Sequence, residues 1–167
     1  MKMDSLHENT IGADELLPLL RERLGAGQTI RYLPFRGCSM LPLLRQGRDS
    51  VELSPLPEKL KKYDLPVYQY PSGKVVMHRV VDVQEDCYIC LGDNTYEYER
   101  ILPEQLIGLV TAFKRRERRI SVESPAYQCY ARMWVALFPV RRFWKKSILQ
   151  LRIWLRPLKA WLRRHLT

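Results

Sequence analysis

The chain has 167 residues, of which 46% are hydrophobic and 28% charged, a composition that excludes a disordered protein and is typical of one globular domain. The net charge of +10 is uneven, because residues 126–167 carry three Lys, seven Arg and no acid, while residues 1–125 are neutral overall. Residues 1–10 are too polar for a signal peptide and no segment has the ~18 apolar residues of a membrane span, so we expect neither export nor a transmembrane helix.

In chain order, the first predicted element is a short amphipathic helix over residues 14–24, with leucines on one face and Gly25 and Gly27 at its end. Alternating apolar residues, separated by Pro, Gly and Asp-Asn turns, then predict strands at 29–35, 49–53, 65–70, 74–83, 86–91 and 107–113, with a helical turn at 102–106. The polar segment 115–119 is predicted as a hairpin tip before a strand at 120–122. This pattern predicts a mainly β fold with a barrel or sandwich core.

After Pro125 the pattern changes to a helical stripe that runs from Trp144 to Leu162, with Pro139 and Pro157 expected to kink it. A basic helix with tryptophans is typical of a segment that lies on an anionic membrane. A partner-binding or core-packing helix is an alternative, and nucleic-acid binding is disfavoured by the large apolar surface. The candidate membrane- or partner-binding residues are Arg141, Arg142, Trp144, Lys145, Lys146, Trp154 and Trp161.

The four cysteines are expected to be free thiols, because no export signal places the chain in an oxidising compartment. Cys87 and Cys90 have the spacing of a zinc or redox pair, but no second pair accompanies them and they fall in a predicted strand. We therefore expect no metal site and no cofactor.

The stretch RGCSMLPLLRQGRD, residues 36–49, places Ser39 in a bend between Gly37 and Pro42. A serine hydroxyl becomes a nucleophile only when a base removes its proton and donors bind the developing oxyanion. His78 is a candidate base, because an imidazole with a pKa near ~6.5 accepts protons at neutral pH without deep burial. A turn serine and a surface histidine are the alternatives without chemistry.

Five segments together resemble the signal peptidase I family, which shares its fold with the self-cleaving SOS-repressor peptidases. They are GCSMLP at residues 37–42, KKYDLPVY at 61–68, VVMHRVV at 75–81, LGDN at 91–94 and GLV at 108–110. Many bacterial members have a lysine base where this chain has His78, whereas archaeal and endoplasmic-reticulum members have a histidine. The resemblance therefore implies a Ser–His endopeptidase.

On this resemblance Ser39 is the nucleophile, His78 the base and Asp93 the acid that orients the imidazole. A further acid often follows in the family, and either Glu97 or Glu99 stands in that region. The matching positions also imply that Met40 lines a small pocket for the substrate side chain before the cut. Gly37 and Pro42 complete the substrate-binding segment, and Gly37 stands where some members carry a hydroxyl for the oxyanion.

The chain departs from the family at Arg48, which interrupts a Gly–Asp pair, and at Tyr63, which replaces a glycine. From residues 1–30 we also expect no counterpart of the family's N-terminal transmembrane helix. We therefore hold two hypotheses: a serine endopeptidase for leader or signal-type peptides, and an inactive relative that binds peptides or docks to membranes. The expected organisation is a peptidase domain at 1–125, with its motifs in 29–113, and a tail at 126–167 that holds it on the cytoplasmic face of a membrane.

Overall fold

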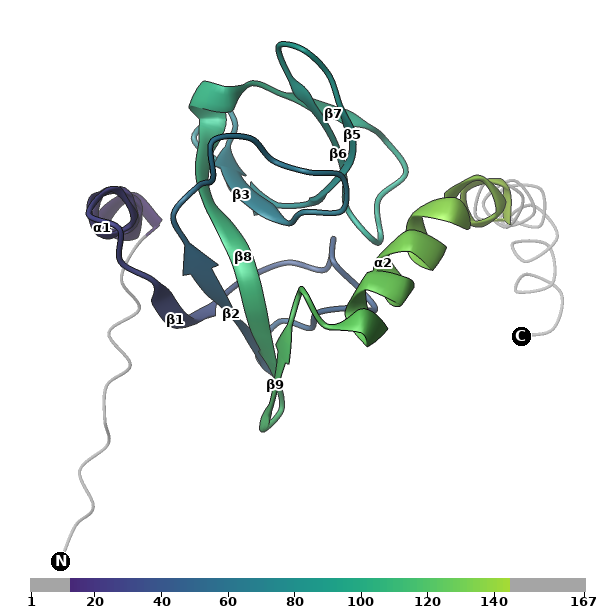
Figure 1. The fold of residues 1–167 in the computed structure, drawn as a ribbon, viewed down its shortest axis with the longest axis horizontal. Helices are drawn as coiled ribbons and strands as arrows, with labels where there is room; N and C mark the ends of the chain where they lie inside the picture. Colours follow the sequence, from purple (N-terminus) through teal and green to yellow (C-terminus); the bar gives the residue numbers. More distant parts are fainter. Residues whose placement is uncertain (1–12, 145–167) are drawn as a thin grey trace, which may run out of the picture.

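The computed structural model describes residues 13–144, and over this range the chain is mainly antiparallel β-structure with helices before and after the strands (Figure 1). This confirms the mainly β class. The candidate residues Lys145, Lys146, Trp154 and Trp161, together with Pro157, lie outside the described residues.

A larger sheet forms one part of the fold, with the strand order β1-β2-β8-β3-β4 and with β9 paired to β8. Its longest strand, β8, pairs with three neighbours, because β2 pairs with its residues 109–115 while β3 and β9 pair with two successive parts, residues 106–109 and 112–115. The strands are β1 Ile30–Pro34, β2 Asp49–Ser54, β3 Pro66–Gln69, β4 Val75–Met77, β8 Leu106–Arg115 and β9 Arg118–Ser121. The hairpin between β8 and β9 confirms the predicted polar tip at 115–119.

A smaller sheet has the order β5-β6-β7, formed by Arg79–Val83, Tyr88–Leu91 and Glu99–Ile101. The sequence predicted one continuous strand at 74–83, which is wrong, because the chain leaves the larger sheet after β4 and enters the smaller sheet at β5. His78 is the residue between the two strands. The strand β7 was not predicted, and a 3-10 turn at Pro103–Gln105 confirms the predicted helical turn that follows it.

The helix α1, Ala13–Gly25, confirms the predicted N-terminal helix and packs its Leu20 and Leu24 into the core. It approaches β8 closely at Gly108, where an added Cβ would lie only 2.7 Å from Cδ1 of Leu24. The main core combines this helix face with the larger sheet and with Met40, Leu43 and Leu44 from the loop after β1.

The helix α2, Pro125–Ala136, lies across the strands from α1 in Figure 1. Helical backbone resumes at residues 138–144, after a break at Leu137, so Pro139 interrupts the helix as expected. Tyr127, Ala131 and Phe138 are all buried against the strands. The structure therefore differs from the predicted boundary at 125/126, because the first part of the predicted tail belongs to the core.

Candidate functional site

Ser39 lies in a turn of the loop that joins β1 to β2, and its side chain is half-buried. Gly37 adopts a φ of +107°, a conformation that glycine reaches without strain, and its N–H donates to Oε1 of Gln46 across the loop at 2.8 Å. Leu41 and Leu44 continue the turn with backbone hydrogen bonds to Cys38 and Met40. The loop is therefore fixed by its own hydrogen bonds on both sides of Ser39.

His78 is buried, with 4% of its surface exposed, and its Nδ1 lies 2.8 Å from Oε2 of Glu99. The hydroxyl of Tyr68 donates to the same carboxylate oxygen and lies 3.0 Å from Nδ1. Burial alone would raise the pKa of Glu99, but hydrogen bonds from His78, Tyr68 and Tyr70 outweigh it and lower this pKa to about 2. Because an ionised carboxylate only accepts hydrogen bonds, the Nδ1–H of His78 is the donor and neutral His78 has its lone pair on Nε2.

The Nε2 atom of His78 is buried and has no hydrogen-bond partner within residues 13–144. Buried polar atoms normally have partners, so an unpaired one needs an explanation, such as a proton-transfer role. Ser39 Oγ is not bonded to it in this structure. Catalytic hydrogen bonds are often long before a substrate binds, so the missing bond does not by itself rule out proton transfer between the two residues.

Gly92 connects the two candidate catalytic residues. A Cβ added at this position would lie 2.9 Å from the carbonyl oxygen of Ser39 and 3.0 Å from Cδ2 of His78, the ring carbon bonded to Nε2. The N–H of Asn94 donates to the same Ser39 carbonyl at 2.7 Å, and the Asn94 side chain donates to the carbonyl of Cys38. The Gly92–Asn94 turn therefore holds the Ser39 backbone beside the Nε2 edge of His78.

Asp93 forms no hydrogen bond with the His78 ring within the described residues, and Glu99 occupies the position beside Nδ1 that the sequence predicted for Asp93. The Asp93 carboxylate instead forms a two-fold ion pair with Arg79, with Nε–Oδ1 and Nη2–Oδ2 distances of 2.9 and 2.8 Å. The side chains of Arg79 and Asp93 are only 1% and 2% exposed. Of the two further candidate acids, the structure selects Glu99, whereas Glu97 is exposed.

The helix α2 and the helical segment that follows it complete the surroundings of this buried ion pair. Tyr127 accepts a hydrogen bond from Nη1 of Arg79, and Tyr130 donates to Oδ2 of Asp93. Trp134 and Arg141 both donate to the Asp93 backbone carbonyl, at 3.0 and 2.7 Å. Burial alone would lower the pKa of Arg79, but the Asp93 carboxylate raises it, so the buried Arg79 guanidinium stays charged.

The remaining predicted substrate-binding residues have different surroundings. Met40 is 3% exposed and packs in the main core, whereas Gly37 and Pro42 are at the surface. The Ser39 N–H donates to no residue in the described range, so it is available as an oxyanion donor. Cys38, whose thiol neighbours Ser39 in the sequence and is therefore a second possible nucleophile, is an exposed free thiol.

The three predicted membrane-binding residues within the described range, Arg141, Arg142 and Trp144, differ in their surroundings. Arg141 folds back on the domain, since its guanidinium stacks 4.0 Å from the ring centre of Trp134 besides its bond to Asp93. It therefore does not project from the domain as predicted. Arg142 is half-buried, whereas Trp144 is 68% exposed. Within the described part of the chain, no helix has both the length and the apolar character needed to cross a bilayer.

The smaller sheet contains the CxxC pair. Cys87 and Cys90 are buried free thiols, and Cys87 accepts a hydrogen bond from Nε of Arg100. Burial and the nearby Glu99 raise the pKa of Cys90 to about 12, so this thiol stays protonated at neutral pH. No cluster of three or more metal-ligating side chains occurs between residues 13 and 144.

Comparisons with known proteins give no match to a family model, to a curated protein or to a solved structure.

Replacing Asp93 with Asn should destabilise the fold by about 3 kcal/mol, because it leaves Arg79 as a buried charge without its counter-ion. The control is Asp82→Asn, the same change at an exposed position of β5, which should alter stability by less than about 0.5 kcal/mol. Urea unfolding measures both. Equal stability of the two variants would contradict a structural role for Asp93.

Replacing Gly92 with Ala should move the Ser39 backbone or the His78 ring, because the new Cβ would lie within 3.0 Å of both. We expect a loss of about 1–3 kcal/mol in unfolding free energy and a shifted His78 imidazole signal in NMR spectra. Gly25→Ala is the control, since a Cβ there meets no atom within 4 Å. An unchanged His78 signal in Gly92→Ala would refute the proposed close approach.

Proposed function

We propose that the protein is a serine endopeptidase in which Ser39 is the nucleophile, His78 the general base and Glu99 the acid that orients His78. The observation that supports this most directly is the contact of His78 Nδ1 with an ionised carboxylate, combined with an unpaired Nε2 whose edge of the ring faces the Ser39 segment. The resemblance of five segments to the signal peptidase I family supports the same assignment.

In the proposed reaction, Ser39 Oγ attacks the peptide carbonyl carbon while His78 Nε2 takes its proton. The Ser39 N–H donates to the developing oxyanion, and Glu99 stabilises the imidazolium. His78 then returns the proton to the leaving amine as the C–N bond breaks, which leaves an acyl-enzyme. A water molecule, activated by His78, hydrolyses this ester and restores the serine.

The substrate in this proposal is a peptide bound in an extended conformation. The strands β1 and β4 stand at the two ends of the main strand order of the larger sheet, and the chain reaches Ser39 shortly after β1 and His78 directly after β4. An open strand edge can hydrogen-bond an extended peptide through its main chain. Leader or signal-type peptides with small residues before the cut fit this mode and the family resemblance.

We also propose that the protein works peripherally at the cytoplasmic face of an anionic membrane. Support comes from the exposed Val140 and Trp144 at the end of the described helix and from the ten basic residues within 126–167. We expect the protein to bind the membrane surface through this region and not through a membrane-spanning helix.

A second candidate function is peptide binding or membrane docking without catalysis. It is favoured by the absence of a hydrogen bond between Ser39 Oγ and His78 Nε2 in this structure. The two functions differ in one outcome, because a binding protein would retain a cognate peptide intact.

With a peptide library rich in Ala-Xaa-Ala sites, the wild-type protein should cleave, and Ser39→Ala and His78→Ala should each lose at least ~100-fold in kcat/KM. The matched control is Cys38→Ala, which removes the neighbouring thiol and should keep activity. Mass spectrometry of the products measures the cleavage. Loss of activity in Cys38→Ala but not in Ser39→Ala would contradict the proposal, because the nucleophile would then be Cys38.

Replacing Glu99 with Gln should lower kcat by roughly 10- to 10⁴-fold, because the imidazolium loses its charged partner. Since the pKa of Glu99 is about 2, its charge is constant above about pH 4, so the titration of Glu99 should not contribute to the pH dependence of the wild-type rate above that pH. Glu97→Gln, the same change at an exposed site, is the control.

The same lowered pKa predicts a change in stability at acid pH. Because the folded-state pKa lies below the ordinary value of 4.5, the Glu99 carboxylate stabilises the fold above pH 4.5, and this contribution is lost as the pH falls toward 2. Glu99→Gln should therefore lose less stability than wild type over this interval. If wild type and Glu99→Gln lost equal unfolding free energy over this interval, the contact of an ionised Glu99 carboxylate with His78 would be contradicted.

A further inference from the structure

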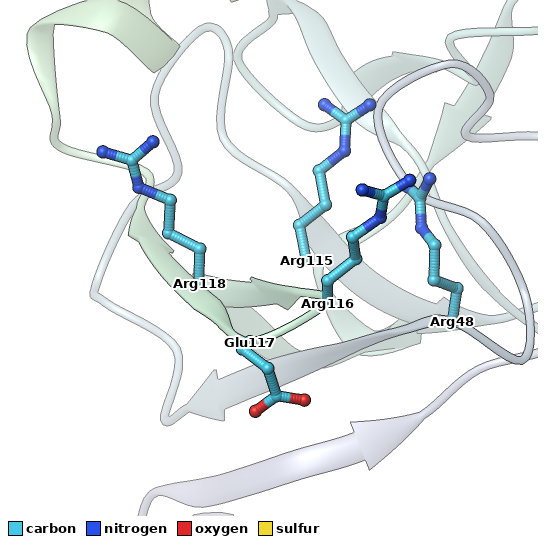
Figure 2. A pocket seen from close by; sticks show the side chains of 5 residues that line it. All are labelled: Arg48, Arg115, Arg116, Glu117 and Arg118. Atoms are coloured by element: carbon cyan, nitrogen blue, oxygen red, sulfur yellow. The ribbon is translucent and has the colours of Figure 1, made fainter.

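A hollow lined mainly by arginines lies beside the hairpin between β8 and β9, and neither Ser39 nor His78 is among its lining residues (Figure 2). Its lining residues, which we call the arginine hollow, are Arg48, Arg115, Arg116, Glu117 and Arg118. In Figure 2 the guanidinium groups of Arg48, Arg115 and Arg116 point to the same side, whereas the Glu117 carboxylate points away.

A buried carboxylate joins the two walls of the arginine hollow. The Asp49 side chain is 0% exposed and binds the Arg48 guanidinium through two hydrogen bonds of 2.7 and 2.6 Å. It also accepts hydrogen bonds from the backbone N–H groups of Arg45 and of Arg116. The turn before β2 and the tip of the hairpin are therefore fixed relative to each other, so the arginines are brought together by a built framework.

Three of the four arginines of the arginine hollow, all from the β8–β9 hairpin, carry positive charge that no acidic side chain compensates within the described residues. Arg115 and Arg118 stand directly opposite each other in the hairpin register, an arrangement of like charges that disfavours the hairpin. The guanidinium groups of Arg115, Arg116 and Arg118 form no ion pair or hydrogen bond with another side chain in the described range. Glu117 pairs with Lys114 at 3.1 Å instead.

We propose that the arginine hollow binds a phosphate monoester group. Guanidinium groups form two-pronged hydrogen bonds with phosphate and carboxylate oxygens alike, but a planar carboxylate offers only two oxygens. A tetrahedral dianion offers several oxygens in different directions and can accept from three or more arginines. Such a ligand would also relieve the repulsion between Arg115 and Arg118.

The surroundings of the arginine hollow indicate how the phosphate is presented. Sites for small molecules are enclosed and mostly apolar, whereas this one is lined by charged side chains, four of which are exposed. A terminal phosphate group that is exposed on a larger molecule or on a membrane surface fits such an open site. The two sources with this chemistry are a lipid headgroup, such as that of phosphatidic acid, and a soluble phosphate monoester.

The test uses the full-length protein and vesicles of phosphatidylcholine with either phosphatidic acid or phosphatidylglycerol, adjusted to equal zeta potential. The first lipid presents a phosphate monoester and the second only a diester. The test variant combines Arg115→Gln, Arg116→Gln and Arg118→Gln. The matched control removes three exposed charges elsewhere, through Arg23→Gln, Lys59→Gln and Lys74→Gln. Circular dichroism and urea unfolding verify that both variants fold.

We expect wild type and control to bind phosphatidic acid vesicles at least about tenfold more tightly than phosphatidylglycerol vesicles, and the test variant to lose this preference. Titration with glycerol phosphate then identifies the source. Saturation below millimolar concentration, with displacement from vesicles, indicates a soluble ligand, and weak competition indicates the lipid headgroup.

The proposal is overturned if wild type binds no phosphate monoester, or if it binds both lipids equally. Equal losses in the two triple variants would also overturn it, because general charge rather than the arginine hollow would then explain binding. The proposal is likewise overturned if single-stranded RNA or polyglutamate, at the same charge concentration as glycerol phosphate, displaces the protein from phosphatidic acid vesicles equally well. Ser39→Ala should bind as wild type does, which separates this result from the peptidase proposal.

Discussion

The buried ion pair between Arg79 and Asp93 is the interaction on which the candidate site depends. Removing two charges from water is costly, and the cost is offset only when geometry and hydrogen bonding are complete. Here both Asp93 oxygens accept from Arg79, and Tyr127 and Tyr130 bind the pair from α2. Such a network is rigid because each member satisfies its neighbours.

This ion pair joins three segments that are distant in the sequence. Arg79 directly follows His78, Asp93 lies in the turn that holds the Ser39 carbonyl, and α2 covers both. The position of Ser39 relative to His78 therefore depends on a structural contact that involves neither the Ser39 hydroxyl nor the His78 ring. The same contact explains why α2 belongs to the domain, although its sequence resembles the start of a basic tail.

Much of the fold was predictable from the sequence because short alternating segments and turn residues mark strands directly. The N-terminal helix, the polar hairpin tip and the break at Pro139 all agree with local patterns. The pattern could not show that the chain changes sheets at His78, because an apolar run on both sides of a bend resembles one long strand. Tyr127 and Ala131 are four residues apart and mark a buried helix face, a signal that could have placed α2 in the core.

The choice between Asp93 and Glu99 illustrates what local patterns omit. Asp93 lies within the Gly92–Asn94 turn and Glu99 follows it by a few residues, so only strand pairing decides which of the two acids reaches His78. In the smaller sheet Glu99 pairs with Cys90, and the adjacent Leu91 pairs with Arg79, so the register brings Glu99 beside His78. Since β7 has only three residues, its sequence carries too little periodicity to be recognised.

The central claim is that His78 activates Ser39 as a nucleophile. A fluorophosphonate, which reacts covalently with activated serine hydroxyls, tests this without knowledge of the substrate. Peptide mapping by mass spectrometry should locate the label on Ser39 in the wild-type protein and should find almost none there in His78→Ala. Labelling that is absent from Ser39 in wild type, or that persists there in His78→Ala, would contradict the account.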